Sequence, residues 1–276
     1  MTLRGRIETP VKALLRRRLL ADRFAMEHFS YSEAGSRAPQ PVLICLWNRP
    51  TRLADVIAML DSQLDVPDGV ELHIWNNNKL DHDHYRDVLR RARPTGALRS
   101  AWIARTPYNL GSIGRFYLAR RIAAERGSTP VIVIDDDEVF DSSFVSVAQQ
   151  HFDPKAITAW WAFSVGDAYF ARVPAEPGGR VDHIGPGGSV MDAAIFSDRS
   201  FFTDIPDRYL YLDDLWLTWW ARDRGYTLAK LPVEISMVMD ETNQYHGLLD
   251  LKEEFFDVLY PDLAAQRRAR EQAAAE

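Results

Sequence analysis

The apolar run 131–134 (Val-Ile-Val-Ile), followed at once by the acidic run 135–138 (Asp-Asp-Asp-Glu), constrains this chain more than any other stretch. Four consecutive apolar, β-branched residues are typical of a strand that is buried on both faces, as in a parallel sheet covered by helices. The acidic residues then stand at the carboxyl end of that strand, which is the edge where open α/β sheets bind ligands. The stretch therefore predicts an acidic site at the edge of a parallel sheet.

The acidic run has the composition of a divalent-cation site. On an extended strand Asp135 and Asp137 point to one side, about 6–7 Å apart, and Asp136 points to the other. This spacing suits a hydrated cation that is held together with a substrate, and hard oxygen ligands with retained waters fit Mg²⁺ or Mn²⁺ beside a diphosphate. Neighbouring carboxylates repel one another, and a cation relieves that repulsion. A solvated acidic turn is the alternative interpretation.

Strands and helices are expected to alternate before the acidic run. The expected strands are 41–47, 70–75, 98–104 and 131–134, and the expected helices are 53–64, 81–91 and a segment that opens near 115 and ends near 126. Such alternation indicates a parallel sheet with right-handed crossovers. After the acids the pattern changes to helices at 144–152, 213–224, 248–259 and 262–275, with short strands at 156–163, 169–173, 189–195, 227–231 and 233–238.

Composition predicts three parts in the 276-residue chain. Residues 1–40 form a basic N-terminal helix and a linker, residues 41–247 form one catalytic domain, and residues 248–276 form a helical extension. Residues 1–23 carry a formal charge of +5 against −11 for the remainder. A basic helix with a short apolar face either packs on the domain or touches an anionic membrane surface, and the shortness of the face favours packing. A chain that starts near Gln40 is expected to keep its chemistry.

Several classes of protein are excluded by what the sequence lacks. The net charge of −6 argues against nucleic acid as the main partner, and a single cysteine, Cys45, leaves no disulfide framework or cysteine metal site. There is no apolar run of about 18 residues and no apolar signal-peptide core, which predicts a cytoplasmic protein. The Gly-rich dinucleotide fingerprint, the P-loop and the Gly-x-Ser-x-Gly elbow are also missing from the sequence.

The motifs that remain resemble those of GT-A fold glycosyltransferases of the family 2 type, over roughly residues 41–246. The resemblance implies an α/β, Rossmann-like nucleotide-diphospho-sugar transferase fold with a mostly parallel central sheet flanked by helices. It rests on the order of six segments: Trp47-Asn48-Arg49-Pro50, Asn76-Asn77, Asn109-x-Gly111-x-x-Gly114-Arg115, Asp135-Asp136-Asp137 in the place of the Asp-x-Asp motif, the loop 185–188, and Leu212-Asp213-Asp214-Leu215 in the place of the Glu-Asp motif.

By this resemblance the donor is a nucleoside diphosphate sugar, with a UDP-sugar favoured, and the metal is Mn²⁺ or Mg²⁺. The implied nucleotide-binding residues are Trp47, Asn48 and Asn76 for the base, Arg115 for the diphosphate or base, and Asp135 and Asp136 for the ribose and metal. The implied metal ligands are Asp137, Asp135 and the late His246. Asn76 replaces an Asp that is common in the family, which leaves the identity of the base open, and a left-handed turn is the alternative role for 76–78.

Asp213 and Asp214 stand at the start of an expected helix, where Asp also serves as a cap for free N–H groups. The resemblance implies that Asp214 is the general base, which takes the proton of the acceptor hydroxyl in a single inverting displacement. The Gln-x-x-Arg-Trp motif of processive relatives is missing, so one sugar is expected to be added per encounter. The acceptor stays open between a glycan, a lipid-linked molecule and a small molecule.

Two other functions compete with this hypothesis. A nucleotidyltransferase of related fold needs a basic, Gly-rich loop after the first strand, where this chain has Asn48-Arg49-Pro50-Thr51-Arg52. A non-catalytic protein that binds sugar nucleotides or glycans needs neither the acidic triple nor the second acidic pair. Both sets of acids are present, which favours the transferase.

Overall fold

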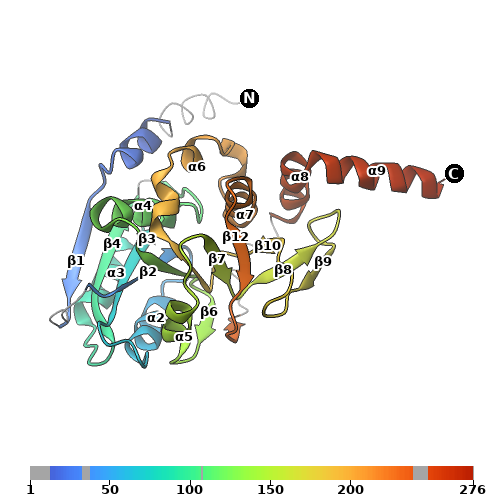
Figure 1. Ribbon diagram of the computed structural model, residues 1–276. Coiled ribbons are helices and arrows are strands. Elements are labelled where there is room, and N and C mark those ends of the chain that lie inside the picture. Colours follow the sequence, from blue (N-terminus) through green and yellow to red (C-terminus); the bar gives the residue numbers. More distant parts are fainter. Residues whose placement is uncertain (1–12, 33–37, 107, 239–247, 276) are drawn as a thin grey trace.

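The computed structural model describes residues 13–32, 38–106, 108–238 and 248–275 (Figure 1). Its centre is an eight-stranded sheet in the order β1-β4-β3-β2-β5-β11-β7-β12. The strands are β1 (Met26–Ser30), β2 (Gln40–Leu46), β3 (Val70–Asn76), β4 (Leu98–Arg105), β5 (Pro130–Ile134), β7 (Ala156–Ala159), β11 (Ser189–Asp192) and β12 (Thr227–Lys230).

The sheet is mostly parallel. Strands β4, β3, β2 and β5 pair in parallel, as do β7 and β12, while β1 and β11 run antiparallel to their neighbours. Ile44 of β2 pairs with Ile134 of β5, and Leu46 pairs with Asn76 of β3. The carboxyl ends of these three strands therefore meet at one edge, which is where an open α/β sheet binds its ligand.

Helices cover both faces of this sheet (Figure 1). Along β5, Val131 and Val133 join one buried cluster, with α4 and α7, and Ile132 and Ile134 join the other, with α2, α3 and α5. Burial on both faces accounts for the uninterrupted apolar run, and the predicted α/β class is confirmed. The helices are α2 (Arg52–Asp61), α3 (His82–Arg91), α4 (Gly114–Arg126), α5 (Phe144–Gln150), α6 (Ser200–Thr203), α7 (Asp213–Asp223), α8 (Leu249–Leu259), α9 (Pro261–Ala275) and the 3-10 turns η1 (Ala193–Ser197) and η2 (Asp207–Tyr209).

The described part of the N-terminal segment packs on the domain. Residues 13–20 are helical and Leu19 is buried in the same cluster as α4, while Arg16 donates a 2.7 Å hydrogen bond to the carbonyl of Phe202. The sequence predicted only a helix and a linker within residues 1–40, whereas Met26–Ser30 form the strand β1, which pairs with β4 at the edge of the sheet. Its side chains are only partly buried, so it lacks the apolar run by which a central strand is recognised.

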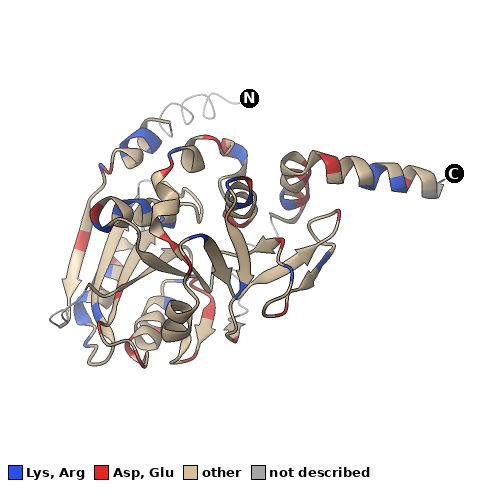
Figure 2. Cartoon of the chain, in the orientation of Figure 1, with Lys and Arg blue, Asp and Glu red and all other residues tan. Residues whose placement is uncertain are grey.

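Basic residues are prominent on this N-terminal helix (Figure 2). Arg17 and Arg18 are exposed, and Leu14 beside them has 59% of its surface exposed. The packed face and the basic face therefore belong to the same short helix. None of the helices in the described ranges has the length and apolarity to cross a bilayer.

Beyond residue 138 the chain departs from the expected strands. The predicted strand 156–163 is two strands, β7 and β8 (Ala162–Val165), because the chain leaves the main sheet at Trp160 and Trp161. The predicted strand 189–195 ends at Asp192, whose carboxylate accepts a 2.8 Å bond from the Ala194 amide and starts a 3-10 turn. The remaining strands are β9 (Arg172–Pro174) and β10 (His183–Ile184), which flank β8, and β6 (Glu138–Phe140), which pairs with β13 (Ile235–Met237).

Candidate functional site

A cleft of about 610 Å³ lies at the carboxyl edge of β2, β3 and β5. Its walls come from distant parts of the chain, which the parallel sheet and the helix starts bring together. The charged and aromatic residues that line it are Trp47, Arg49, Arg115, Asp135, Asp136, Asp137, Glu138, Trp161, Tyr211, Asp213, Asp214 and Lys252. The cleft therefore contains both acidic motifs that the sequence singled out.

The three aspartates after β5 form a turn. β5 ends at Ile134, and the amide of Glu138 reaches back to the carbonyl of Asp135 at 3.3 Å. The side chains of Asp135 and Asp137 are 37% and 18% exposed, against 8% for Asp136. Asp135 and Asp137 are thus more accessible than Asp136. Alternation along a strand would give the same result, but here a turn places Asp136 on the buried side.

Arg49 holds two of these carboxylates. Its guanidinium lies 2.7 Å from Oδ1 of Asp136 and 3.4 Å from Oδ2 of Asp137. Burial raises the pKa of Asp136 to about 7, and the charge of Arg49 opposes that rise. Arg52 adds a 3.0 Å hydrogen bond to the carbonyl of Asp136. The segment after β2 therefore braces the acidic turn, a role that the sequence did not indicate for Arg49.

Arg115 joins the two acidic motifs. It stands in the first turn of α4 and is 2% exposed, with one guanidinium nitrogen 2.5 Å from Oδ1 of Asp135 and the other 3.0 Å from Oδ2 of Asp213. Burial alone would lower the pKa of Arg115, but the two carboxylates raise it well above its ordinary value. The sequence placed Arg115 near the diphosphate or base. In the structure it lines the cleft and pairs with acids of both walls.

Asp213 and Asp214 begin α7 but do not cap it, because the helix has no side-chain cap hydrogen bond. Asp213 accepts a 2.5 Å bond from the Ser112 hydroxyl and pairs with Arg115. Burial raises the pKa of Asp213 despite these partners. The capping alternative is therefore not what holds these two side chains in place.

Asp214 has a different environment. Its Oδ2 accepts from the hydroxyl of Tyr169 at 2.9 Å and from Nζ of Lys252 at 2.8 Å. Burial would raise the pKa of Asp214, but the charge of Lys252 and these hydrogen bonds lower it below its ordinary range. His183 lies 3.8 Å from the same oxygen, and burial lowers the pKa of this imidazole to about 4, so it is neutral at pH 7.

Two glycines are required by close approach. A Cβ at Gly114 would lie 2.0 Å from Nε1 of the buried Trp75, so α4 can begin against this ring only with glycine there. A Cβ at Gly187 would lie 2.4 Å from Oδ2 of Asp135 and 2.3 Å from Oε1 of Glu138. The predicted loop 185–188 therefore passes with its backbone directly against the acidic turn.

The residues expected to bind the base are placed in different ways. Trp47 lines the cleft, whereas Asn48 is exposed with a left-handed φ of 58° and does not line it. Asn76 is fully buried, and its Oδ1 accepts a 2.8 Å bond from the Asn78 amide. Asn77 lines the cleft in its place and bonds the Leu110 amide and the Gly111 carbonyl at 3.1 and 2.9 Å. For Asn76 the turn is the role that its contacts support.

The accessible carboxylates meet the minimum requirement of a Mg²⁺ or Mn²⁺ site. Such ions bind through one or two carboxylates together with substrate phosphates and waters, and Asp135 and Asp137 are the two most exposed acids of the turn. Within the described ranges there is no group of three or more His, Cys, Asp or Glu placed to hold a metal. His246, the third expected ligand, lies outside the described residues. The donor set thus fits an ion that is bound together with a diphosphate.

The structure also reveals site residues that sequence reasoning missed, namely Arg49, Tyr169, His183 and Lys252. Lys252 had a signal in the sequence. It stands three, four and seven residues before Phe255, Phe256 and Leu259, which are buried, so it occupies the apolar stripe of α8. A lysine on such a stripe indicates a buried anionic partner. Tyr169 and His183 carried no comparable signal, because only the fold brings the turn between β8 and β9, which holds Tyr169, and the short strand β10, which holds His183, to Asp214.

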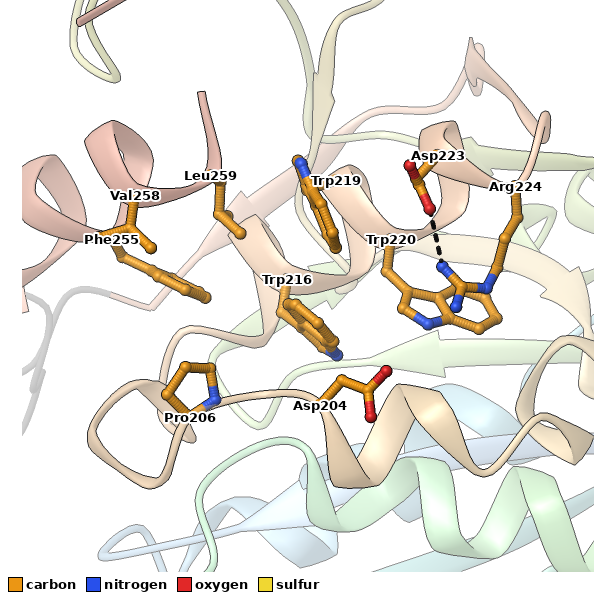
Figure 3. Close-up of a pocket in the computed structure, with 10 residues that line it drawn as sticks. All are labelled: Asp204, Pro206, Trp216, Trp219, Trp220, Asp223, Arg224, Phe255, Val258 and Leu259. Atoms are coloured by element: carbon orange, nitrogen blue, oxygen red, sulfur yellow. Dashed lines mark hydrogen bonds and ion pairs between the residues drawn. The ribbon is translucent and has the colours of Figure 1, made fainter. Parts of the chain in front are cut away.

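A second hollow, of about 360 Å³, lies between α7 and α8 (Figure 3). Trp216 and Trp220 at its base are buried, and their indole nitrogens bond the Phe201 carbonyl and the Ser200 hydroxyl. Arg224 lies over Trp220 at 4.0 Å from the ring centroid. These two buried rings pack α7 against the segment that contains Ser200 and Phe201.

The fold of this chain is similar to that of known protein structures. No protein-family model matches the sequence, and no curated protein matches it. The structure of S. aureus TarS residues 1–349 in complex with UDP is similar with a TM-score of 0.50 at 13% identity, over 82% of this chain and 70% of that one. The chain has a GT-A fold. The predicted GT-A architecture is therefore confirmed.

Two further structures of TarS are similar over smaller parts of their length. One is S. aureus TarS with a TM-score of 0.45 at 12% identity, of which this chain spans 43%, and the other is S. aureus TarS 1–349 with a TM-score of 0.43 at 15% identity, of which it spans 58%.

Proposed function

We propose that this protein is a metal-dependent glycosyltransferase that moves a sugar from a nucleoside diphosphate sugar to a hydroxyl acceptor. The observation that carries the proposal is the pairing of two acidic walls in one cleft of a GT-A fold, with Asp135 and Asp137 on one wall and Asp214 on the other. A donor needs cationic and hydrogen-bonding partners for its diphosphate, and an acceptor needs a base. The two walls offer these functions separately.

The donor wall holds the nucleotide in this proposal. Trp47 and Asn77 line the end of the cleft where the base binds, with Asp136 nearby for the ribose. Asp135 and Asp137 hold Mg²⁺ or Mn²⁺, which stabilises the charge of the leaving diphosphate when it is bound. His246 is retained as a proposed third ligand. Because the TarS structure of similar fold binds UDP, a UDP-sugar is the first donor to test.

The acceptor wall supplies the base. Among the described residues, the partners of the Asp214 carboxylate all contact Oδ2, so Oδ1 is the oxygen for an incoming hydroxyl. The acceptor oxygen forms a bond to the anomeric carbon, its proton passes to Asp214, and the electron pair of the breaking bond leaves with the diphosphate. This single displacement inverts the anomeric centre. Asp213 fixes Arg115 and the start of α7.

The experiment is a donor-hydrolysis assay with a panel of sugar nucleotides, with and without Mn²⁺. Release of the nucleoside diphosphate from one donor, dependent on metal, supports a transferase. A nucleotidyltransferase would instead release pyrophosphate from a nucleoside triphosphate and a sugar phosphate. Binding of a sugar nucleotide with no turnover of any donor, even with glycan, lipid-linked and small-molecule acceptors, would contradict the proposal in favour of a binding protein.

The location of the protein and the number of sugars it adds per encounter stay predictions. The location is proposed to be cytoplasmic, with the basic helix 13–20 in contact with the inner face of the membrane. Arg17, Arg18 and Leu14 are exposed on that helix, while Leu19 packs on the domain. Addition of a single sugar per encounter is likewise proposed.

A further inference from the structure

Asp214 receives a cationic partner from the C-terminal helix α8. Nζ of Lys252 lies 2.8 Å from Oδ2 of Asp214 and 3.1 Å from the hydroxyl of Tyr169, which donates to the same oxygen. Lys252 is buried, and the ammonium also lies 5.2 Å from the ring centroid of Tyr169. A buried lysine is stable only when its charge is paired and hydrogen-bonded.

These contacts fix the orientation of the Asp214 carboxylate. Two donors from different elements converge on Oδ2, so the carboxylate cannot rotate without breaking both bonds. Neither of these two bonds involves Oδ1, and Asp214 lines the cleft. Such double support by a second layer of side chains is what holds a reacting group in a productive geometry.

We propose that Lys252 is a positioning residue of the transfer reaction, and that α8 is consequently part of the catalytic centre. The inference rests on the proposed function of Asp214 as the base. Lys252 acts through Asp214 in two ways. It holds the carboxylate in one rotamer, and its charge keeps the carboxylate ionised in a buried place that would otherwise favour the neutral acid.

The electrostatic surroundings of Asp214 decide the sign of the expected effect. Burial raises its pKa, and the charge of Lys252 is the largest influence that lowers it, together with the hydrogen bonds from Lys252 and Tyr169. If the ammonium of Lys252 is removed, the charge that most strongly lowers the pKa of Asp214 is lost while burial still raises it, so the pKa of Asp214 rises. The groups that face this carboxylate are Lys252 from α8, Tyr169 before β9, His183 from β10, Arg172 from β9 across the Tyr169 ring, and Asp213 from α7.

The test is the pH profile of transfer in the full-length protein. In Lys252→Met the acid limb of kcat should move to higher pH by about 1–3 pH units, the range for losing one opposite charge. Lys252→Arg keeps a charge and should restore most of the profile. Lys155→Met, an exposed lysine before β7, is the matched control and should leave the profile unchanged. The KM for the donor should change little in all three variants, because the donor wall is separate.

The outcomes separate this inference from the proposed function. If wild-type protein transfers sugar and Lys252→Met keeps the wild-type acid limb, Lys252 is structural and the inference is overturned while the transferase stands. If wild type turns over no donor, both are overturned. If Lys252→Met does not fold, judged by circular dichroism, Lys252→Gln replaces it, because glutamine keeps a polar side chain at this buried position and removes the charge. An unchanged acid limb in Lys252→Gln would then overturn the inference.

Discussion

On the donor wall of the cleft, the acids follow directly from the end of one strand, whereas on the acceptor wall Asp214 takes its partners from three other segments. Asp135, Asp136 and Asp137 are neighbours in sequence, and Arg49 reaches them from the adjacent strand end. Asp214 on α7 meets Tyr169, His183 and Lys252 only through tertiary packing. A wall built from one turn is expected to tolerate distant changes that the assembled wall does not.

Asp136 on the donor wall and Asp214 on the acceptor wall also differ in the direction in which their pKa values are displaced. On the donor wall burial raises the pKa of Asp136 to about 7 in spite of Arg49, and on the acceptor wall Lys252 overcomes burial and lowers the pKa of Asp214. Carboxyl groups whose environments separate their pKa values in this way are suited to different tasks. Asp136 is thus able to hold a proton up to about pH 7, whereas Asp214 stays ionised.

The largest expected effect is on the acceptor wall. Asp214→Asn keeps the size of the side chain but cannot accept the acceptor proton, so transfer should fall by about 10²–10⁴-fold, the usual range for loss of a general base. Donor affinity, measured by calorimetry with the nucleoside diphosphate, should persist. Asp213→Asn is the control. It removes one partner of the buried Arg115 and should lower the melting temperature more than the turnover, and the reverse pattern would move the base to Asp213.

The second effect belongs to the donor wall. Asp137→Ala removes an accessible carboxylate at the sheet edge. Loss of a residue that only supports a metal ligand lowers metal affinity by up to about 100-fold, so loss of a ligand should lower the Mn²⁺-dependent affinity for the donor by about 100-fold. The fold should be retained. Calorimetry that gives the same Mn²⁺-dependent affinity as wild type would remove Asp137 from the metal site.

A third prediction uses the raised pKa of Asp136. Because the native carboxyl holds its proton up to about pH 7 while the unfolded one loses it near its ordinary pKa of 3.8, the native state binds more protons between these values. The free energy of unfolding should therefore fall as pH rises from 4 to 7. A tenfold change in an acid dissociation constant corresponds to about 1.4 kcal/mol. Between pH 4 and pH 7 the free energy of unfolding, measured by urea titration, should fall by at least that much less in Asp136→Asn than in wild type. An equal fall in both proteins would contradict the raised pKa.

The smallest effect is expected outside the cleft. If the helix 13–20 touches an anionic surface, each exposed arginine should contribute about 1 kcal/mol to binding. Reversal of Arg17 and Arg18 to Glu should then weaken sedimentation with phosphatidylserine vesicles at low salt and leave donor hydrolysis unchanged. Wild-type protein that ignores such vesicles even at low salt would end the membrane proposal.

The N-terminal segment also has packing contacts with the domain, and its deletion tests their contribution to stability. The sequence suggests that a chain starting near Gln40 keeps its chemistry, whereas the structure places Leu19 in the core and pairs β1 with β4. Deletion of residues 1–39 exposes the edge of β4 and should lower the melting temperature. Donor hydrolysis at low temperature tests whether the chemistry survives that loss.

The sequence alone determined the parallel half of the sheet and the position of its acidic edge. Runs such as 42–46 and 131–134 are typical of buried strands, and the acids that follow 131–134 are expected at the carboxyl edge, because both features depend on neighbours in the chain. The start of α7 at Asp213 was likewise predictable from its residues. The sequence did not decide whether Asn76 binds a base or forms a turn. In the structure Asn76 is buried, and its side chain accepts a hydrogen bond from the amide of Asn78 within the turn.

Tertiary structure decided how the carboxylates are paired. That Arg49 braces Asp136, that Arg115 lies between Asp135 and Asp213, and that Lys252 reaches Asp214 all depend on contacts between segments 20 to 98 positions apart. The same packing decided that Trp160 and Trp161 divide one expected strand into two. A local pattern reports periodicity and charge, but the pKa and orientation of a buried side chain depend on which distant groups are packed against it.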